Sequence, residues 1–214
     1  MLVGLGNNAM SMHRYAEALN YYDEANKRHE IQIPEKTVPA HIYREVLHLK
    51  RAKALLYLDR FEAARDIISA SGQVVVKKLG NDHFLVAEGL LILGTLCSLT
   101  GKYAQAHLLL ERSQQTFAAN FGDEHPVQVE VMYAIAENMR LPGYYEDAVN
   151  EDGKAMALGA ALFGQKTSHQ AIFVAQRAVI LRDVGKHADA AKLFLESLAL
   201  IKETVGASSA FYAH

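Results

Sequence analysis

The sequence predicts an all-α fold, a solenoid of stacked antiparallel helix pairs, because three series of residues recur at one spacing. An aromatic residue or histidine returns every 42 residues, after a first step of 46. An alanine stands three residues after each of these anchors, and a glycine or alanine stands nine residues before it. Self-similarity at such a period is typical of stacked supersecondary units. The anchors are Tyr15, Phe61, Tyr103, Tyr145 and His187.

The small residues beside the anchors predict where the two helices of each pair cross. Helix axes approach to about 8–10 Å only when the residues at the contact are small. Those before the anchors are Gly6, Ala52, Gly94, Ala136 and Ala178, and those after are Ala18, Ala64, Ala106, Ala148 and Ala190. Larger residues are expected to fill the space around the crossing. They are Leu5, Leu93 and Ile135 on the first helices and Tyr22, Ile68, Leu110 and Phe194 on the second.

The third repeat shows the residue pattern that predicts each pair of helices. An apolar stripe at helical spacing runs over residues 86–97 and stops at the turn Thr100-Gly101-Lys102. A second helix begins at Tyr103 and ends before Gly122, which can take a left-handed conformation. Pro126 suits the first turn of the helix that follows. The same reading places repeats at 1–38, 39–81, 82–123, 124–165 and 166–207, with 208–214 starting a sixth.

Three features of the array are irregular. The first repeat starts part-way into its first helix and the sixth is incomplete, so we expect a piece of a longer protein whose uncapped ends self-associate. The first junction is longer and contains Ile33-Pro34 and Val38-Pro39, which we interpret as a surface insertion. In the fourth repeat, Asp152 replaces an apolar residue, and Gly153 and Gly159 each cost about 1 kcal/mol in a helix interior. We expect this helix to be the least protected.

The chain resembles tetratricopeptide repeats over its whole length. The residues that carry the resemblance follow the order small, aromatic, alanine, as in Leu93-Gly94, Tyr103-Ala104-Gln105-Ala106 and Ser113. The common repeat has 34 residues, whereas the period of 42 and the turn Gly122–Pro126 are similar to the kinesin light chain subgroup. This resemblance implies a right-handed superhelix whose concave face holds a segment of a partner, and it implies no catalysis.

Two binding modes of related repeats are not carried over to this chain. Kinesin light chains have asparagines on the inner face of the first helices, where they grip a bound peptide. The aligned residues here are Val3, Leu49, Leu91, Tyr133 and Ala175. Co-chaperone repeats hold a terminal carboxylate with a clamp of Lys, Arg and Asn. Asn7 matches one member of that clamp, but its partner positions hold Val3, Glu88 and Ile92.

We expect function on the inner face of the first helices. A mixed set of charges suits a protein segment better than a polyanion. The alternative, that these are only solvated surface charges, stays open at about even weight. The candidate partner-binding residues are Asn7, Lys50, Lys53, Tyr57, Glu88, Tyr133, Glu137, Arg140 and Arg182.

No residue pattern indicates catalysis, a cofactor or a metal. The segment Gly4–Ala9 fits the spacing of a dinucleotide-binding turn but lacks the strand that must precede it. The ten histidines have no metal-ligand spacing, and we interpret His83 and His125 as structural turn residues. Cys97 falls on a buried stripe, where cysteine behaves as a small apolar residue.

Composition narrows the class of function further. The net charge of −2 gives no basic field for nucleic acid, and no run of about 20 apolar residues predicts membrane insertion. A single cysteine fits a reducing, cytoplasmic compartment, with cytoskeletal association left open. We expect a non-catalytic protein–protein interaction scaffold. The alternative is a sensor or regulatory array of a larger enzyme or signalling ATPase whose catalytic domain lies outside this sequence.

Overall fold

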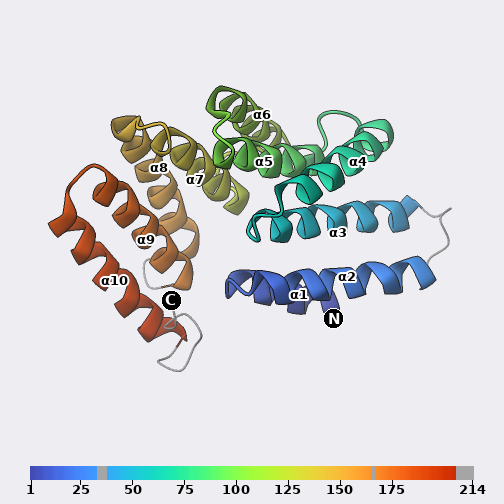
Figure 1. The fold of residues 1–214 in the computed structure, drawn as a ribbon, viewed down its shortest axis with the longest axis horizontal. Coiled ribbons are helices and arrows are strands. Elements are labelled where there is room, and N and C mark those ends of the chain that lie inside the picture. Colours follow the sequence, from blue (N-terminus) through green and yellow to red (C-terminus); the bar gives the residue numbers. More distant parts are fainter. Residues whose placement is uncertain (33–37, 165–166, 206–214) are drawn as a thin grey trace. The chain divides into compact units, whose positions relative to one another are not determined.

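The computed structural model describes residues 1–32, 38–164 and 167–205, and these form antiparallel helix pairs (Figure 1). The first helices are α1 (Leu2–Ser11), α3 (Val38–Leu56), α5 (Phe84–Leu99), α7 (Pro126–Arg140) and α9 (Ser168–Asp183). The second helices are α2 (Tyr15–Gln32), α4 (Phe61–Leu79), α6 (Tyr103–Phe121), α8 (Tyr145–Phe163) and α10 (His187–Val205). The described ranges contain no strand, and the predicted all-α class is confirmed.

The anchor of every repeat is the first residue of a second helix. The alanine three residues later donates its backbone N–H to the carbonyl of the residue before the anchor, at 2.9 Å for Ala18 and Ala106. This bond closes the first turn of the helix. These alanines are at most 3% exposed.

The turn between the two helices of a pair needs a left-handed residue. Gly101, Gly143 and Gly185 fill this position with φ of 77°, 97° and 85°. In the two earlier repeats the position is held by His13 and Asp59, with φ of 56° and 57°. A side chain makes this conformation strained, although asparagine, aspartate and histidine tolerate it better than most residues.

The inter-repeat turns end in polar side chains that cap the following helices. Nδ1 of His83 accepts from the backbone N–H of Leu85, and Nδ1 of His125 accepts from that of Val127, both at 3.2 Å. A cap of this kind satisfies one of the free N–H groups at a helix start. The interpretation of His83 and His125 as turn residues is therefore confirmed.

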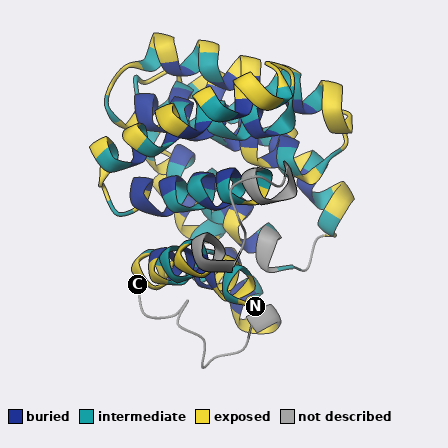
Figure 2. Cartoon of the chain, turned by 90° about the vertical axis from the view of Figure 1, so that its right-hand side faces the viewer, coloured by how far each residue is buried: buried dark blue, intermediate teal, exposed yellow. Residues whose placement is uncertain are grey.

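The helices group into two compact units, Met1–Leu96 and Cys97–His214, which divide within α5. Each unit has its own core, and buried residues are coloured dark blue in Figure 2. The core of the first unit includes Tyr22, Leu47, Ile68, Leu85 and Leu96. A core cluster of the second unit contains Val129, Tyr133, Ala155 and Phe173.

The predicted crossing residues are buried, and most of the larger residues around them are buried too. Tyr22, Ile68, Leu110 and Ile135 are at most 5% exposed, whereas Leu93 and Phe194 are half-buried. The prediction for Leu5 is wrong, because its side chain is 40% exposed. The equivalent residues on α3 and α9, Arg51 and Arg177, contact the second helix of the preceding repeat.

Two sequence predictions lie partly outside the described residues. Ile33-Pro34 of the expected insertion falls within 33–37, whereas Val38-Pro39 begins α3. The start of the sixth repeat falls within 206–214.

Candidate functional site

The candidate residues fall in both compact units, and each group is described by itself. Asn7, Lys50, Lys53, Tyr57 and Glu88 belong to the first unit. Tyr133, Glu137, Arg140 and Arg182 belong to the second. We use the term inner face for the side of the first helices that carries these residues.

In the first unit, Asn7 on α1 is held by a buried tyrosine of α2. The hydroxyl of Tyr22 donates to Oδ1 of Asn7 at 2.9 Å, and the Tyr22 side chain is 1% exposed. Burial raises the pKa of Tyr22 to about 12, an effect that Lys53 opposes and Glu88 reinforces. The hydroxyl therefore stays a hydrogen-bond donor, and three of the candidate residues lie around it.

Tyr57 forms an aromatic surface with a residue that the sequence analysis used only as an anchor. Its ring stacks on Tyr15 with centroids 4.7 Å apart and an interplanar angle of 15°, while 45% of Tyr57 remains exposed. The Tyr15 hydroxyl lies 2.6 Å from Nδ1 of His13. Burial raises the pKa of Tyr15 to about 12, with Lys53 acting in the opposite direction. Lys53 therefore lies close to an exposed tyrosine stack.

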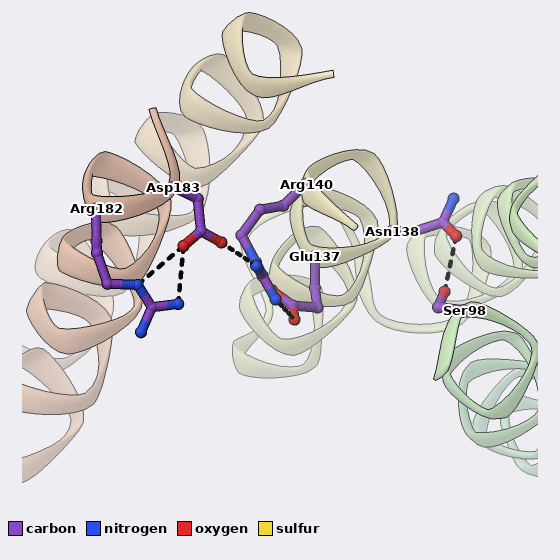
Figure 3. Close-up of polar contacts among 6 residues, drawn as sticks. All are labelled: Ser98, Glu137, Asn138, Arg140, Arg182 and Asp183. Atoms are coloured by element: carbon purple, nitrogen blue, oxygen red, sulfur yellow. Dashed lines mark hydrogen bonds and ion pairs between the residues drawn. The ribbon is translucent and has the colours of Figure 1, made fainter. Parts of the chain in front are cut away.

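In the second unit, four charged side chains form a continuous chain of ion pairs, which we call the ladder (Figure 3). Nε and Nη2 of Arg140 on α7 donate to the two carboxylate oxygens of Glu137, at 2.8 and 2.5 Å. Nη1 of the same arginine donates to Oδ2 of Asp183 on α9. Oδ1 of Asp183 accepts from Nε of Arg182 at 2.9 Å. The ladder thus joins the first helices of two successive repeats.

The ladder is electrically balanced, with two arginines and two carboxylates. Hydrogen bonds to Glu137 raise the pKa of Arg140, burial opposes this rise, and Asp183 adds to it. Burial acts to raise the pKa of Asp183, but hydrogen bonds from Arg182 and Arg140 outweigh it and leave the pKa below its ordinary value. Arg140 and Asp183 therefore carry their charges at neutral pH.

Tyr133 lies in the core of the second unit and not on an open surface. Its ring stacks on Phe173 of α9 at 4.8 Å, and the side chain is 7% exposed. Burial raises the pKa of its hydroxyl. The aromatic residue of the next repeat covers it, so the expected role of Tyr133 in contacting a partner needs correction.

Several polar contacts between repeats were not predicted from the sequence. Arg177 on α9 donates to the buried Asp152 of α8 at 3.0 Å. Arg51 on α3 donates to Asp23 of α2 at 2.5 Å. The sequence did contain a signal for these two contacts, because Arg51 and Arg177 both stand ten residues before an anchor.

A third missed contact lies beside the ladder, between α5 and α7. Ser98 donates to Oδ1 of Asn138 at 2.7 Å, and Nδ2 of Asn138 donates to the carbonyl of Tyr103 at 3.2 Å. Asn138 is 4% exposed, and its amide therefore has both a donor and an acceptor partner in the interior. No repeated spacing marks this contact.

The segment Gly4–Ala9 and Cys97, which the sequence analysis considered as possible chemical sites, lie in helices. Gly4–Ala9 lies within α1, where the backbone is helical and offers no phosphate-binding loop. Cys97 is 3% exposed and belongs to the interior. Within the described residues, no group of His, Cys, Asp and Glu could hold a metal ion, and no helix has the length and apolar character that a membrane span requires.

Comparison with known proteins identifies the repeat. Residues 176–210 match the sequence model of the tetratricopeptide repeat family. A search of curated protein sequences finds no match.

Solved structures resemble the chain over almost its whole length. Nearly identical TPR-like repeats assigned to a kinesin light chain of Podosopora anserina share 16% identity, with a TM-score of 0.58 and coverage of 94% of both chains. BtubC (BKLC) from P. vanneervenii shares 13% identity, with a TM-score of 0.66 over 94% of this chain and 79% of that one. PlcR of Bacillus thuringiensis, solved with the peptide PapR7 and DNA, shares 14% identity, with a TM-score of 0.74 over 94% of this chain and 69% of that one. Residues 176–210 therefore match a tetratricopeptide repeat, and the fold of the chain is similar to that of kinesin light chain TPR-like repeat structures.

Proposed function

We propose that the chain is a non-catalytic scaffold that binds a segment of another protein along the inner face of its first helices. The observation that carries this proposal is the ordering of accessible polar and aromatic side chains on that face. Tyr57 is exposed yet fixed by its stack on Tyr15, and Arg182 is exposed yet fixed by Asp183. Side chains that are ordered before binding lose less entropy when a partner arrives.

The comparisons support a protein or peptide as the partner. Tetratricopeptide repeats share an architecture that generally serves protein–protein interaction. One similar structure, PlcR, was solved in complex with a peptide. The mixed charges of the inner face favour such a partner over a polyanion.

Photo-cross-linking tests which face binds. A benzophenone amino acid replaces Tyr57 on the inner face in one variant and Leu108 in a second. Leu108 lies on the second helix α6 and is 68% exposed. We expect partner cross-links from position 57 and none from position 108. The reverse pattern would show that the partner uses another surface.

Charge reversal tests the same proposal with natural amino acids only. Lys53→Glu and Glu137→Lys change the inner face in the first and second unit, and Lys78→Glu changes an exposed residue at the end of α4. We expect capture of the partner to fall in the first two variants only. Unchanged capture by both inner-face variants would contradict the proposal.

A regulatory array of a larger protein is the second candidate function. The likeness to PlcR favours it, because the matched fold there occupies 69% of a longer chain that was solved with a peptide and DNA. In either role we expect the protein in the cytoplasm, since the sequence contains a single cysteine and so cannot form a disulfide within the chain.

A further inference from the structure

The inner face of α9 combines an apolar stripe with a charged end. Ile172, Val179 and Arg182 follow one another at helical spacing and therefore lie on one side of the helix. Ile172 is 37% exposed, Val179 is half-buried, and the Arg182 side chain is 53% exposed. Apolar and cationic contacts are thus available along a single line.

Arg182 is oriented before any ligand binds. Its Nε and Nη2 lie 2.9 and 2.8 Å from Oδ1 of Asp183. Asp183 is fixed in turn by Arg140, which the two carboxylate oxygens of Glu137 hold. The remaining nitrogen, Nη1, points away from Asp183 (Figure 3), and no contact engages it among the residues that the structure describes.

The chemistry of this nitrogen limits the ligand. An arginine nitrogen only donates hydrogen bonds, so the ligand group must be an acceptor, and carboxylates match the guanidinium geometry. A phosphate cluster or other polyanion would approach Asp183 and Glu137 as well as the arginines, and the ladder offers no net positive charge to offset that repulsion. A single carboxylate at the exposed end of Arg182 avoids this.

We propose that α9 binds a partner segment that carries one acidic side chain on Arg182 and one aliphatic side chain on Ile172 and Val179. This rests on the proposed function and names the partner chemistry of the same face. Ile172 and Arg182 are ten residues apart in a helix, which corresponds to about 15 Å. An extended partner segment covers that distance in about four or five residues.

Synthetic peptides test this recognition on the whole chain. A short peptide in a Gly/Ser background carries Leu and Glu about four residues apart, with both termini blocked so that Glu is the only carboxylate. Companion peptides reverse the order, replace Glu by Gln or replace Leu by Ser. Fluorescence polarisation measures the binding. We expect one order of Leu and Glu to bind best, and the Gln and Ser peptides to bind at least about tenfold more weakly.

Protein variants assign the carboxylate contact to Arg182. Arg182→Gln should remove the difference between the Glu and Gln peptides, whereas Arg112→Gln, at an exposed arginine of α6, should keep it. Equal discrimination by wild type and Arg182→Gln, or no binding of any peptide, would overturn the inference. The scaffold proposal fails separately, when the cross-linker at position 57 captures no partner.

Discussion

Arg177 reaches from α9 to a carboxylate on α8 that is closed off from solvent, with its Nη1 3.0 Å from Oδ2 of Asp152. Asp152 is 0% exposed, and the other repeats hold Tyr22, Ile68, Leu110 and Phe194 at this position. Nη1 of Arg177 also donates to the carbonyl of Val149 at 2.8 Å. One ion pair therefore occupies a place that is apolar elsewhere in the array.

We predict that Arg177→Met destabilises the protein by about 3 kcal/mol, because it leaves Asp152 as an unpaired charge in the interior. Replacing both partners, as Asp152→Leu with Arg177→Met, should restore most of the lost stability, since apolar replacement of a buried pair is often neutral. Urea unfolding measures the free energies. A double variant as unstable as the single one would contradict this account.

The pH dependence of Arg177→Met gives an independent check. Burial raises the pKa of Asp152 above its ordinary value, and Arg177 opposes that rise. In the variant the opposing effect is gone, so the folded state binds a proton more readily than the unfolded state. Stability then increases as pH falls. We expect the gap between wild type and variant to narrow between pH 7 and pH 5, as measured by urea unfolding, and a constant gap would argue against a buried, ionised Asp152.

The two glycines Gly159 and Gly72 should respond oppositely to alanine. A Cβ at Gly159 would lie 2.4 Å from Cε2 of Phe173, whereas a Cβ at Gly72 meets nothing within 4 Å. Gly72→Ala should therefore stabilise α4 by about 0.5–1 kcal/mol. Gly159→Ala should destabilise by about 1–3 kcal/mol through overpacking. Thermal unfolding compares them, and a stabilised Gly159→Ala would show that the helix tolerates a side chain there.

The contact of Gly159 with Phe173 changes the interpretation of α8, which the sequence predicted to be a weak helix. Glycine and aspartate in this helix predicted a weak segment, yet Gly159 makes room for Phe173 and Asp152 is paired. Whether α8 exchanges its amide hydrogens faster than α6 stays a prediction. Hydrogen exchange at equal solvent conditions tests it.

Repetition explains which features the sequence could predict. Small residues at the helix crossings recur in every repeat, and Ala52, Ala136 and Ala178 are all 0% exposed. Arg140 and Asp183 are 43 residues apart and pair at one junction only, so no period marks them. Tyr133 stands at an inner-face position, but the position alone does not reveal that Phe173 covers its ring.

Ala106→Leu tests the crossing argument directly. Ala106 is 0% exposed at the start of α6, so we expect a leucine there to overpack its surroundings and cost about 1–3 kcal/mol. Ala104→Leu, two residues earlier on an exposed side of the same turn, is the matched control and should change stability little. Equal melting temperatures for the two variants would contradict the crossing argument.

Self-association gives a last prediction, centred on α10. Leu195 and Leu198 are 67% and 45% exposed, and they lie one turn apart on the same side of this helix. Exposed apolar side chains grouped on a helix favour contact with a second copy. We expect Leu195→Glu to lower the fraction of dimer seen by sedimentation velocity, whereas Leu108→Glu on α6 should leave it unchanged. Leu195 and Leu108 have similar exposed fractions, 67% and 68%. An equal effect of the two substitutions on the dimer fraction would therefore indicate non-specific association and not a surface on α10.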